Sequence, residues 1–268
     1  MPAIELFLGL IAFGAIAGFL AGLLGVGGGL VIVPVMVWFL SSANLGGDHV
    51  QHLAVGTSLA VMVFTSFASV LAHHRRGAVD WAIVRGMAPG IVLGTFAGSQ
   101  VAGLIPSDAL KWFFVVYAYA IAVQMFFNAK PTAHRAMPGR LGQLGASGVI
   151  GVVSSFVGIG GGSMSVPFMS WCNVPIHRAI ATSAALGWPI AVSGAIGYLA
   201  SGWNVSGLPW GAAGFVYLPA MATLMVLTVL LAPAGASAAH KLPVARLKKA
   251  FALLMALMAS QMLASLLR

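Results

Sequence analysis

Long apolar runs alternate with short polar stretches along the chain. The runs fall near residues 4–24, 30–40, 52–73, 82–104, 109–127, 143–157, 162–173, 178–200, 212–232 and 247–267. Most suffice for an α-helix that crosses a bilayer, which needs about 20 apolar residues. The runs at 30–40 and 162–173 are too short to cross comfortably, and each follows a cluster of glycines. The pattern predicts an all-α polytopic membrane protein with two half-helices, short helices that begin at a glycine break.

The amino-acid composition is typical of a protein embedded in a lipid bilayer. Of 268 residues, 60% are hydrophobic and 6% are charged, whereas a soluble domain is about 25% charged. This excludes a cytosolic enzyme and a nucleic-acid binder. The single cysteine, Cys172, cannot form an internal disulfide, and no Cys/His spacing indicates a zinc site. We expect no catalytic residues, no metal and no cofactor.

The two halves of the chain resemble each other in three places that follow the same order. The matched ranges are 22–34 with 155–167, 52–58 with 177–183, and 106–124 with 243–261. Three ordered matches indicate a duplication. We predict a first membrane repeat over 1–127, a cytoplasmic linker over 128–142 and a second membrane repeat over 143–268.

The number of segments in each repeat sets the orientation of the second repeat. Five segments are an odd number, so the second repeat should enter the membrane from the opposite face and be inverted. This topology puts eleven of the thirteen Lys and Arg residues on one side and leaves only Lys111 and Arg268 on the other. By the positive-inside rule the side with eleven Lys and Arg residues is cytoplasmic. This predicts that both termini lie outside.

The glycine breaks are the strongest candidates for a binding site. They contain Gly25, Gly27, Gly28 and Gly29 in the first repeat and Gly158, Gly160, Gly161 and Gly162 in the second. Irregular backbone within a membrane is tolerated only inside protein or beside a cavity. The free N–H groups and partial positive charge of the following helix favour an anion. The alternative is that these glycines only permit close helix packing.

Hydroxyl side chains stand at matching positions after each half-helix. Thr57 and Ser58 match Thr182 and Ser183, and Ser163 and Ser165 interrupt the apolar pattern of the second half-helix. A hydroxyl can donate to an anion without the desolvation cost of a fixed charge. The alternative is a hydrogen bond to the carbonyl of the preceding helical turn. Leu30 and Ile32 occupy the first-repeat positions of Ser163 and Ser165. Any site is therefore asymmetric, with these two hydroxyls in the second repeat only.

His52 and His177 are titratable residues that occupy equivalent positions in both repeats, each near a helix start. Proton coupling is one hypothesis for this pair. The other is that both are interfacial residues with water partners.

The chain resembles the TauE/SafE family of sulfite and organosulfonate exporters. The resemblance rests on the Gly-Val-Gly-Gly-Gly break with Pro34, on the matching break of the second repeat that ends at Pro167, and on the segments 54–58 and 179–183. It implies export of small sulfur oxyanions or carboxylates, with the glycine breaks and the Thr-Ser pairs as the substrate region. The run 224–231 departs from the resemblance, because it lacks the glycine spacing found at 90, 94 and 98.

A secondary transporter of small anions that works by alternating access explains these features best. A passive anion channel, or a membrane-embedded enzyme or assembly subunit, is the alternative. The partners we expect are a small anion, such as sulfite, an organosulfonate or a short carboxylate, and the lipid bilayer, without nucleic acid. The expected location is the bacterial cytoplasmic (inner) membrane.

Overall fold

Helices form almost all of the chain, as the apolar runs predict. The structure is a computed structural model that describes residues 3–24, 28–127, 136–239 and 244–267. In this part of the chain the elements, in order, are α1 (Ala3–Leu24), α2 (Gly29–Ser42), the 3-10 helix η1 (Gly47–His49), α3 (Val50–Arg75), α4 (Trp81–Ala102), α5 (Ser107–Phe126), α6 (Arg140–Val157), α7 (Gly162–Trp171), α8 (Ile176–Gly202), β1 (Ala212–Ala213), β2 (Val216–Tyr217), α9 (Leu218–Ala239) and α10 (Val244–Leu266).

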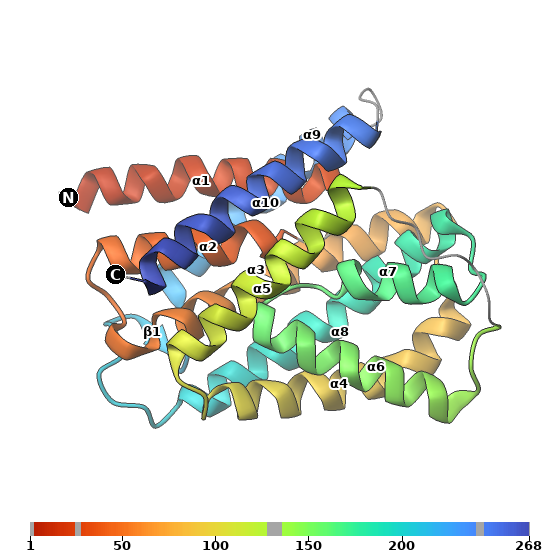
Figure 1. Cartoon of the computed structure of the whole chain (residues 1–268), viewed down its shortest axis with the longest axis horizontal. Coiled ribbons are helices and arrows are strands. Elements are labelled where there is room, and N and C mark those ends of the chain that lie inside the picture. Colours follow the sequence, from red (N-terminus) through yellow and green to blue (C-terminus); the bar gives the residue numbers. More distant parts are fainter. Residues whose placement is uncertain (1–2, 25–27, 128–135, 240–243, 268) are drawn as a thin grey trace.

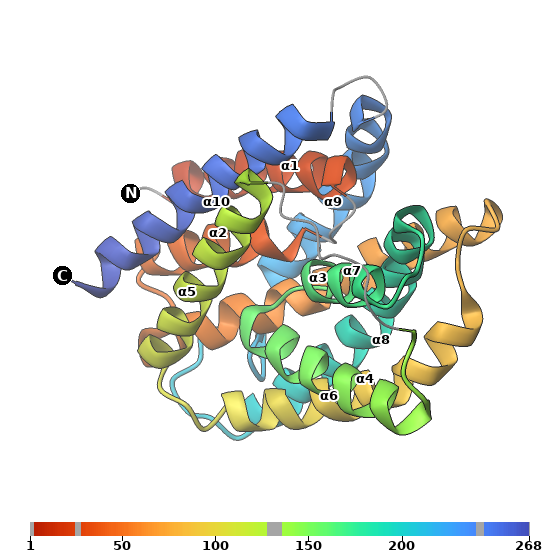
Figure 2. The ribbon, with the colours of Figure 1, turned by 45° about the vertical axis from the view of Figure 1, so that its right-hand side comes forward.

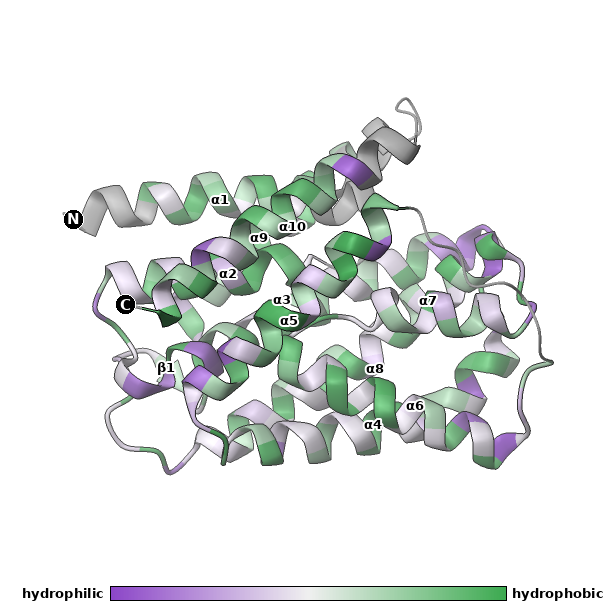
Figure 3. Cartoon of the chain, viewed as in Figure 1, coloured by the Kyte–Doolittle hydropathy of each residue, from purple (hydrophilic) through white to green (hydrophobic). Residues whose placement is uncertain are grey.

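The described helices include five segments long and apolar enough to cross a membrane. These are Gly47–Arg75, Trp81–Ala102, Ser107–Phe126, Ile176–Gly202 and Lys249–Leu266. Large apolar side chains such as Leu93, Val116 and Leu257 are exposed, and hydrophilic residues gather mainly near helix ends and loops (Figure 3). Such a surface suits hydrocarbon and would be unfavourable in water. The prediction of an all-α polytopic membrane protein is confirmed.

Helices from the two halves of the chain interleave. Helix α1 packs along α9 and α4 along α6, so the first helix of each half lies against the fourth helix of the other (Figures 1 and 2). Helices α3 and α8 pack together, as do α5 and α10. Helix α2 packs on α3, and α7 packs on α8.

Glycines allow the close approach of the interleaved helices. A methyl group at Gly94 of α4 would overlap the carbonyl oxygen of Gly148 in α6. In the other pair the small residues come from α1, because a methyl at Gly18 would lie 2.7 Å from the Cα atom of Thr228 in α9. The missing glycine pattern at 224–231 is therefore compensated by glycines on the partner helix.

The half-helices have the short lengths that the sequence predicts. Helix α2 has 14 residues and α7 has 10. All residues of α2 from Gly29 to Leu40 are buried except the half-buried Trp38. Burial on every side explains why this helix is apolar all round.

Candidate functional site

Each half-helix starts at a glycine in the left-handed conformation. The N-cap of α2 is Gly28 with φ 77° and ψ −12°, and the N-cap of α7 is Gly161 with φ 71° and ψ −8°. A side chain with a Cβ atom takes this conformation only at a cost of about 1–2 kcal/mol. The two breaks therefore share one backbone geometry. Gly25 and Gly27 lie outside the described residues.

The two glycine breaks lie against each other. A methyl group at Gly29 would overlap the carbonyl oxygen of Gly158 and would lie 2.9 Å from the sulfur of Met62. Gly158 ends α6 with φ 75°. The start of α2 therefore packs directly on the end of α6, with only a glycine able to fit.

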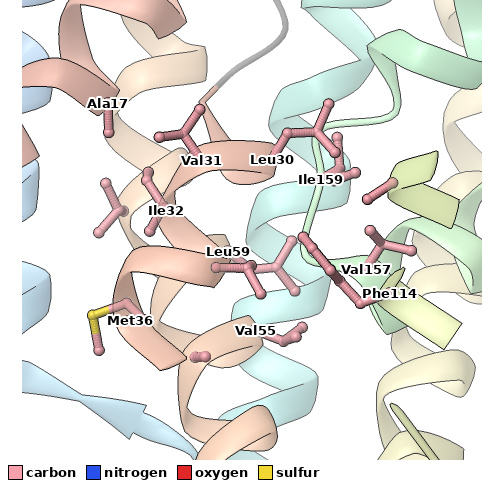
Figure 4. Close-up of a cluster of buried hydrophobic side chains, with 14 of the residues drawn as sticks. Ala17, Leu30, Val31, Ile32, Met36, Val55, Leu59, Phe114, Val157 and Ile159 are labelled. Carbon is pink, nitrogen blue, oxygen red and sulfur yellow. The ribbon is translucent and has the colours of Figure 1, made fainter. Parts of the chain in front are cut away.

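A hydroxyl joins the first half of the chain to the second break. Ser58 on α3 donates to the carbonyl oxygen of Gly158 over 3.0 Å, and this hydrogen bond is buried. The chain neighbours of the two breaks, Leu30, Val157 and Ile159, belong to a cluster of buried hydrophobic side chains (Figure 4). In this conformation the proton of Ser58 is used in a hydrogen bond within the protein.

The threonine of each Thr-Ser pair bonds the opposite half. Thr57 Oγ1 accepts from the backbone N–H of Tyr217 over 2.9 Å, and Thr182 Oγ1 accepts from that of Asp80 over 3.0 Å. Tyr217 directly precedes α9 and Asp80 directly precedes α4. The two contacts are thus equivalent in the two halves, and neither is the bond to the preceding turn that the sequence left open.

Two buried hydroxyls near the second break have no hydrogen-bond partner among the described residues. Ser165 on α7 is fully buried and Ser183 on α8 is 2% exposed. The Oγ atom of Ser165 lies 3.4 Å from the position that a Cβ atom on Gly161 would occupy. Gly160 and Gly162 flank that glycine, and Gly160 is buried. A polar ligand at the start of α7 would lie next to the hydroxyl of Ser165.

A tyrosine that sequence reasoning missed extends the site. Tyr117 Oη lies 2.6 Å from Ser163 Oγ, which links α5 to the first turn of α7. The two residues are 46 positions apart, and Tyr117 stands in an apolar helix with no pattern that marks it. Only the packing of α5 near α7 identifies it.

The paired histidines occupy different surroundings. His52 is 2% exposed, and its Nε2 atom lies 3.0 Å from the carbonyl oxygens of both Ala102 and Ile105. Two acceptors require that Nε2 carries the proton. The ring of His52 also stacks on Phe215, with 4.8 Å between centroids. His177 is exposed, so the proton-coupling hypothesis rests on two histidines in unlike environments.

The sequence matches one protein family and several membrane proteins of other organisms. The family model described as sulfite exporter TauE/SafE matches residues 10–262. A probable membrane transporter protein of Haemophilus influenzae is 36% identical over 252 residues, which cover 93% of this chain and 95% of the relative. One of Methanocaldococcus jannaschii is 30% identical over 224 residues, or 82% of this chain and 81% of the relative. No solved structure matches the chain.

Proposed function

Because the chain belongs to the sulfite exporter TauE/SafE family, it is a multi-pass membrane transporter and not an enzyme, and we propose that it exports small sulfur-containing oxyanions. Sulfite and organosulfonates are the proposed substrates, alternating access is the proposed mechanism, and the bacterial cytoplasmic membrane is the proposed location. The proposed topology puts both termini outside and the 128–142 linker in the cytoplasm, with eleven of thirteen Lys and Arg residues on the cytoplasmic side.

The observation that carries this proposal is a pair of glycine-capped helix starts at one contact between the halves: the start of α2 packs on Gly158, and α7 begins after Gly161, three residues later. In α7 the amides of Met164 and Ser165 bond the Gly161 carbonyl, so the amides of Gly162 and Ser163 precede the first intrahelical bonds. In α2 the amides of Val31 and Ile32 bond Gly28 in the same way. Free amides at a helix start favour an anion.

The free energies of hydrogen bonding support recognition of an anion without a Lys or Arg side chain in the site. A hydrogen bond to a charged group contributes about 1.5–3 kcal/mol. Four to six amide and hydroxyl donors would therefore offset a dehydration cost on the order of 10 kcal/mol. No Lys or Arg occurs in the segments 25–40 or 158–172. Neutral donors suit a carrier, because the anion must also leave.

The contacts between the halves suggest how the site opens. An anion that enters between the breaks must separate Gly29 from Gly158, which releases the hydroxyl of Ser58 from the Gly158 carbonyl. The freed hydroxyl then donates to the anion. In the proposed topology Thr57 bonds the extracellular loop before α9, and Thr182 bonds the cytoplasmic loop before α4. We propose that each threonine hydrogen bond closes one side of the site and breaks when that side opens.

Flux measurements on purified protein in liposomes test the proposed function. Uptake of labelled sulfite should saturate with concentration and be inhibited by other substrates of the class, for which taurine, sulfoacetate and a short carboxylate are the competitors. Flux that rises linearly without saturation would favour a passive channel. No sulfite flux above that of empty liposomes would refute sulfite as a substrate.

A further inference from the structure

We infer that the oxyanion is recognised by the second half of the chain, through the hydroxyls of Ser165 and Ser183 together with the start of α7. The inference rests on the proposed function and names the groups that select its substrate. Both hydroxyls are buried without a partner among the described residues. A buried hydroxyl without a hydrogen bond costs free energy, so a ligand that supplies the missing acceptors would gain affinity.

The hydroxyls of Thr95 and of the half-buried Ser170 and Ser201 also lack a partner, but most other buried helical serines in the described chain avoid this cost. Their hydroxyls donate to a carbonyl three or four residues earlier, as seen for Ser66, Ser99, Ser147, Ser155 and Ser193. The Ser165 hydroxyl makes no such bond. The carbonyl of Gly161, four residues earlier, accepts the backbone N–H of Ser165 at 2.7 Å instead. Among the buried serines of the described residues, Ser165 and Ser183 are therefore the two whose buried hydroxyl oxygen has no partner.

The Ser165 hydroxyl lies beside the second break, and Ser183 lies one helical turn before the residue of α8 that packs on it. Ser165 Oγ lies next to Gly161, at 3.4 Å from the position of a Cβ atom there. Ser183 shares a helix face with Gly187, one turn later. A methyl group at Gly187 would lie 3.2 Å from the carbonyl oxygen of Gly160. The face of α8 that carries Ser183 is thus the face that packs on the break, and α7 packs on α8.

The first half has no unpaired buried hydroxyl at the matching positions. The positions that match Ser163 and Ser165 are Leu30 and Ile32, both buried and apolar. The position that matches Ser183 is Ser58, whose hydroxyl already donates to Gly158. The site thus combines unpaired hydroxyls on the side of α7 with apolar side chains at the matching positions of α2. Such a site fits an anion with several separate oxygen acceptors and a small or apolar remainder, which describes sulfite and short alkyl sulfonates.

Alanine substitution of the two serines tests this assignment. The measurements are the dissociation constant for sodium sulfite and the melting temperature without sulfite, both on purified protein in detergent. We expect Ser165→Ala and Ser183→Ala each to weaken sulfite binding about tenfold to a hundredfold, the loss of one hydrogen bond to a charged ligand. The melting temperature should stay the same or rise, because the substitution removes an unpaired buried hydroxyl.

Ser147→Ala and Ser193→Ala are the matched controls, because both hydroxyls donate within their own helix. They should leave sulfite affinity unchanged. Wild-type affinity in both Ser165→Ala and Ser183→Ala would overturn the inference, and so would a large fall in melting temperature, which would indicate a structural hydroxyl. If wild-type protein carries sulfite while the serine variants bind it normally, only this inference fails. If wild-type protein neither binds nor carries sulfite, the proposed function fails as well.

Discussion

Replacement of Ser58 by alanine tests whether the two glycine breaks are held together as the structure indicates. The Ser58 hydroxyl donates to the carbonyl oxygen of Gly158 over 3.0 Å, and this hydrogen bond is buried. Alanine removes this bond and leaves a buried carbonyl without that donor, which costs about 1–3 kcal/mol. At about 2–4 °C per kcal/mol for a domain of this order of size, the melting temperature should fall by about 2–12 °C.

Ser66→Ala is the control on the same helix. Ser66 donates to the carbonyl of Met62, one turn earlier in α3, and that carbonyl keeps its helical backbone acceptor role after the substitution. We expect a cost of about 1 kcal/mol or less. Unfolding is measured with a thiol-reactive fluorescent dye, because Cys172 is buried and is the single cysteine. Equal shifts for Ser58→Ala and Ser66→Ala would refute the role of Ser58 in joining the breaks.

Three further results are expected. Gly28→Val and Gly161→Val should each abolish sulfite uptake while the protein still inserts, because both positions have φ above 70° and a β-branched residue is strained there; normal uptake by both would leave the glycines without a role in the site. Thr57→Ala and Thr182→Ala should each lose about 0.5–1.5 kcal/mol of stability and slow sulfite uptake, whereas unchanged uptake in both variants would refute their gating role. Cysteines at Ser41 and Ala136, in a Cys172→Ser background, should react with an impermeant reagent from outside and inside respectively, and reaction of both from one side would contradict the inverted topology.

The fold was largely predictable because its main signals are local in sequence. Apolar runs of about 20 residues indicate crossing helices, and a short run after consecutive glycines indicates a helix start. Gly28 and Gly161 have the positive φ that this prediction requires. The lengths of α2 and α7 follow from the same local pattern.

The partners of the polar side chains were not predictable, because they come from distant parts of the chain. Thr57 bonds a residue 160 positions away and Thr182 one 102 positions away. The histidines differ because the connections that follow α3 and α8 differ in length. The segment 203–217 is long and brings Phe215 onto His52, whereas the segment 76–80 that corresponds to it has five residues. Equal positions in a repeat thus do not ensure equal surroundings.

Counterflow of sulfite through reconstituted protein tests the central claim, transport of a small oxyanion by alternating access, most directly. Liposomes loaded with a high concentration of unlabelled sulfite are diluted into a trace of labelled sulfite, and internal label is followed over time. A carrier that alternates between two sides should show a transient accumulation of label above its equilibrium level, and Gly161→Val should abolish it. Label that rises monotonically to equilibrium, at a rate independent of the internal sulfite, would contradict alternating access and indicate a channel.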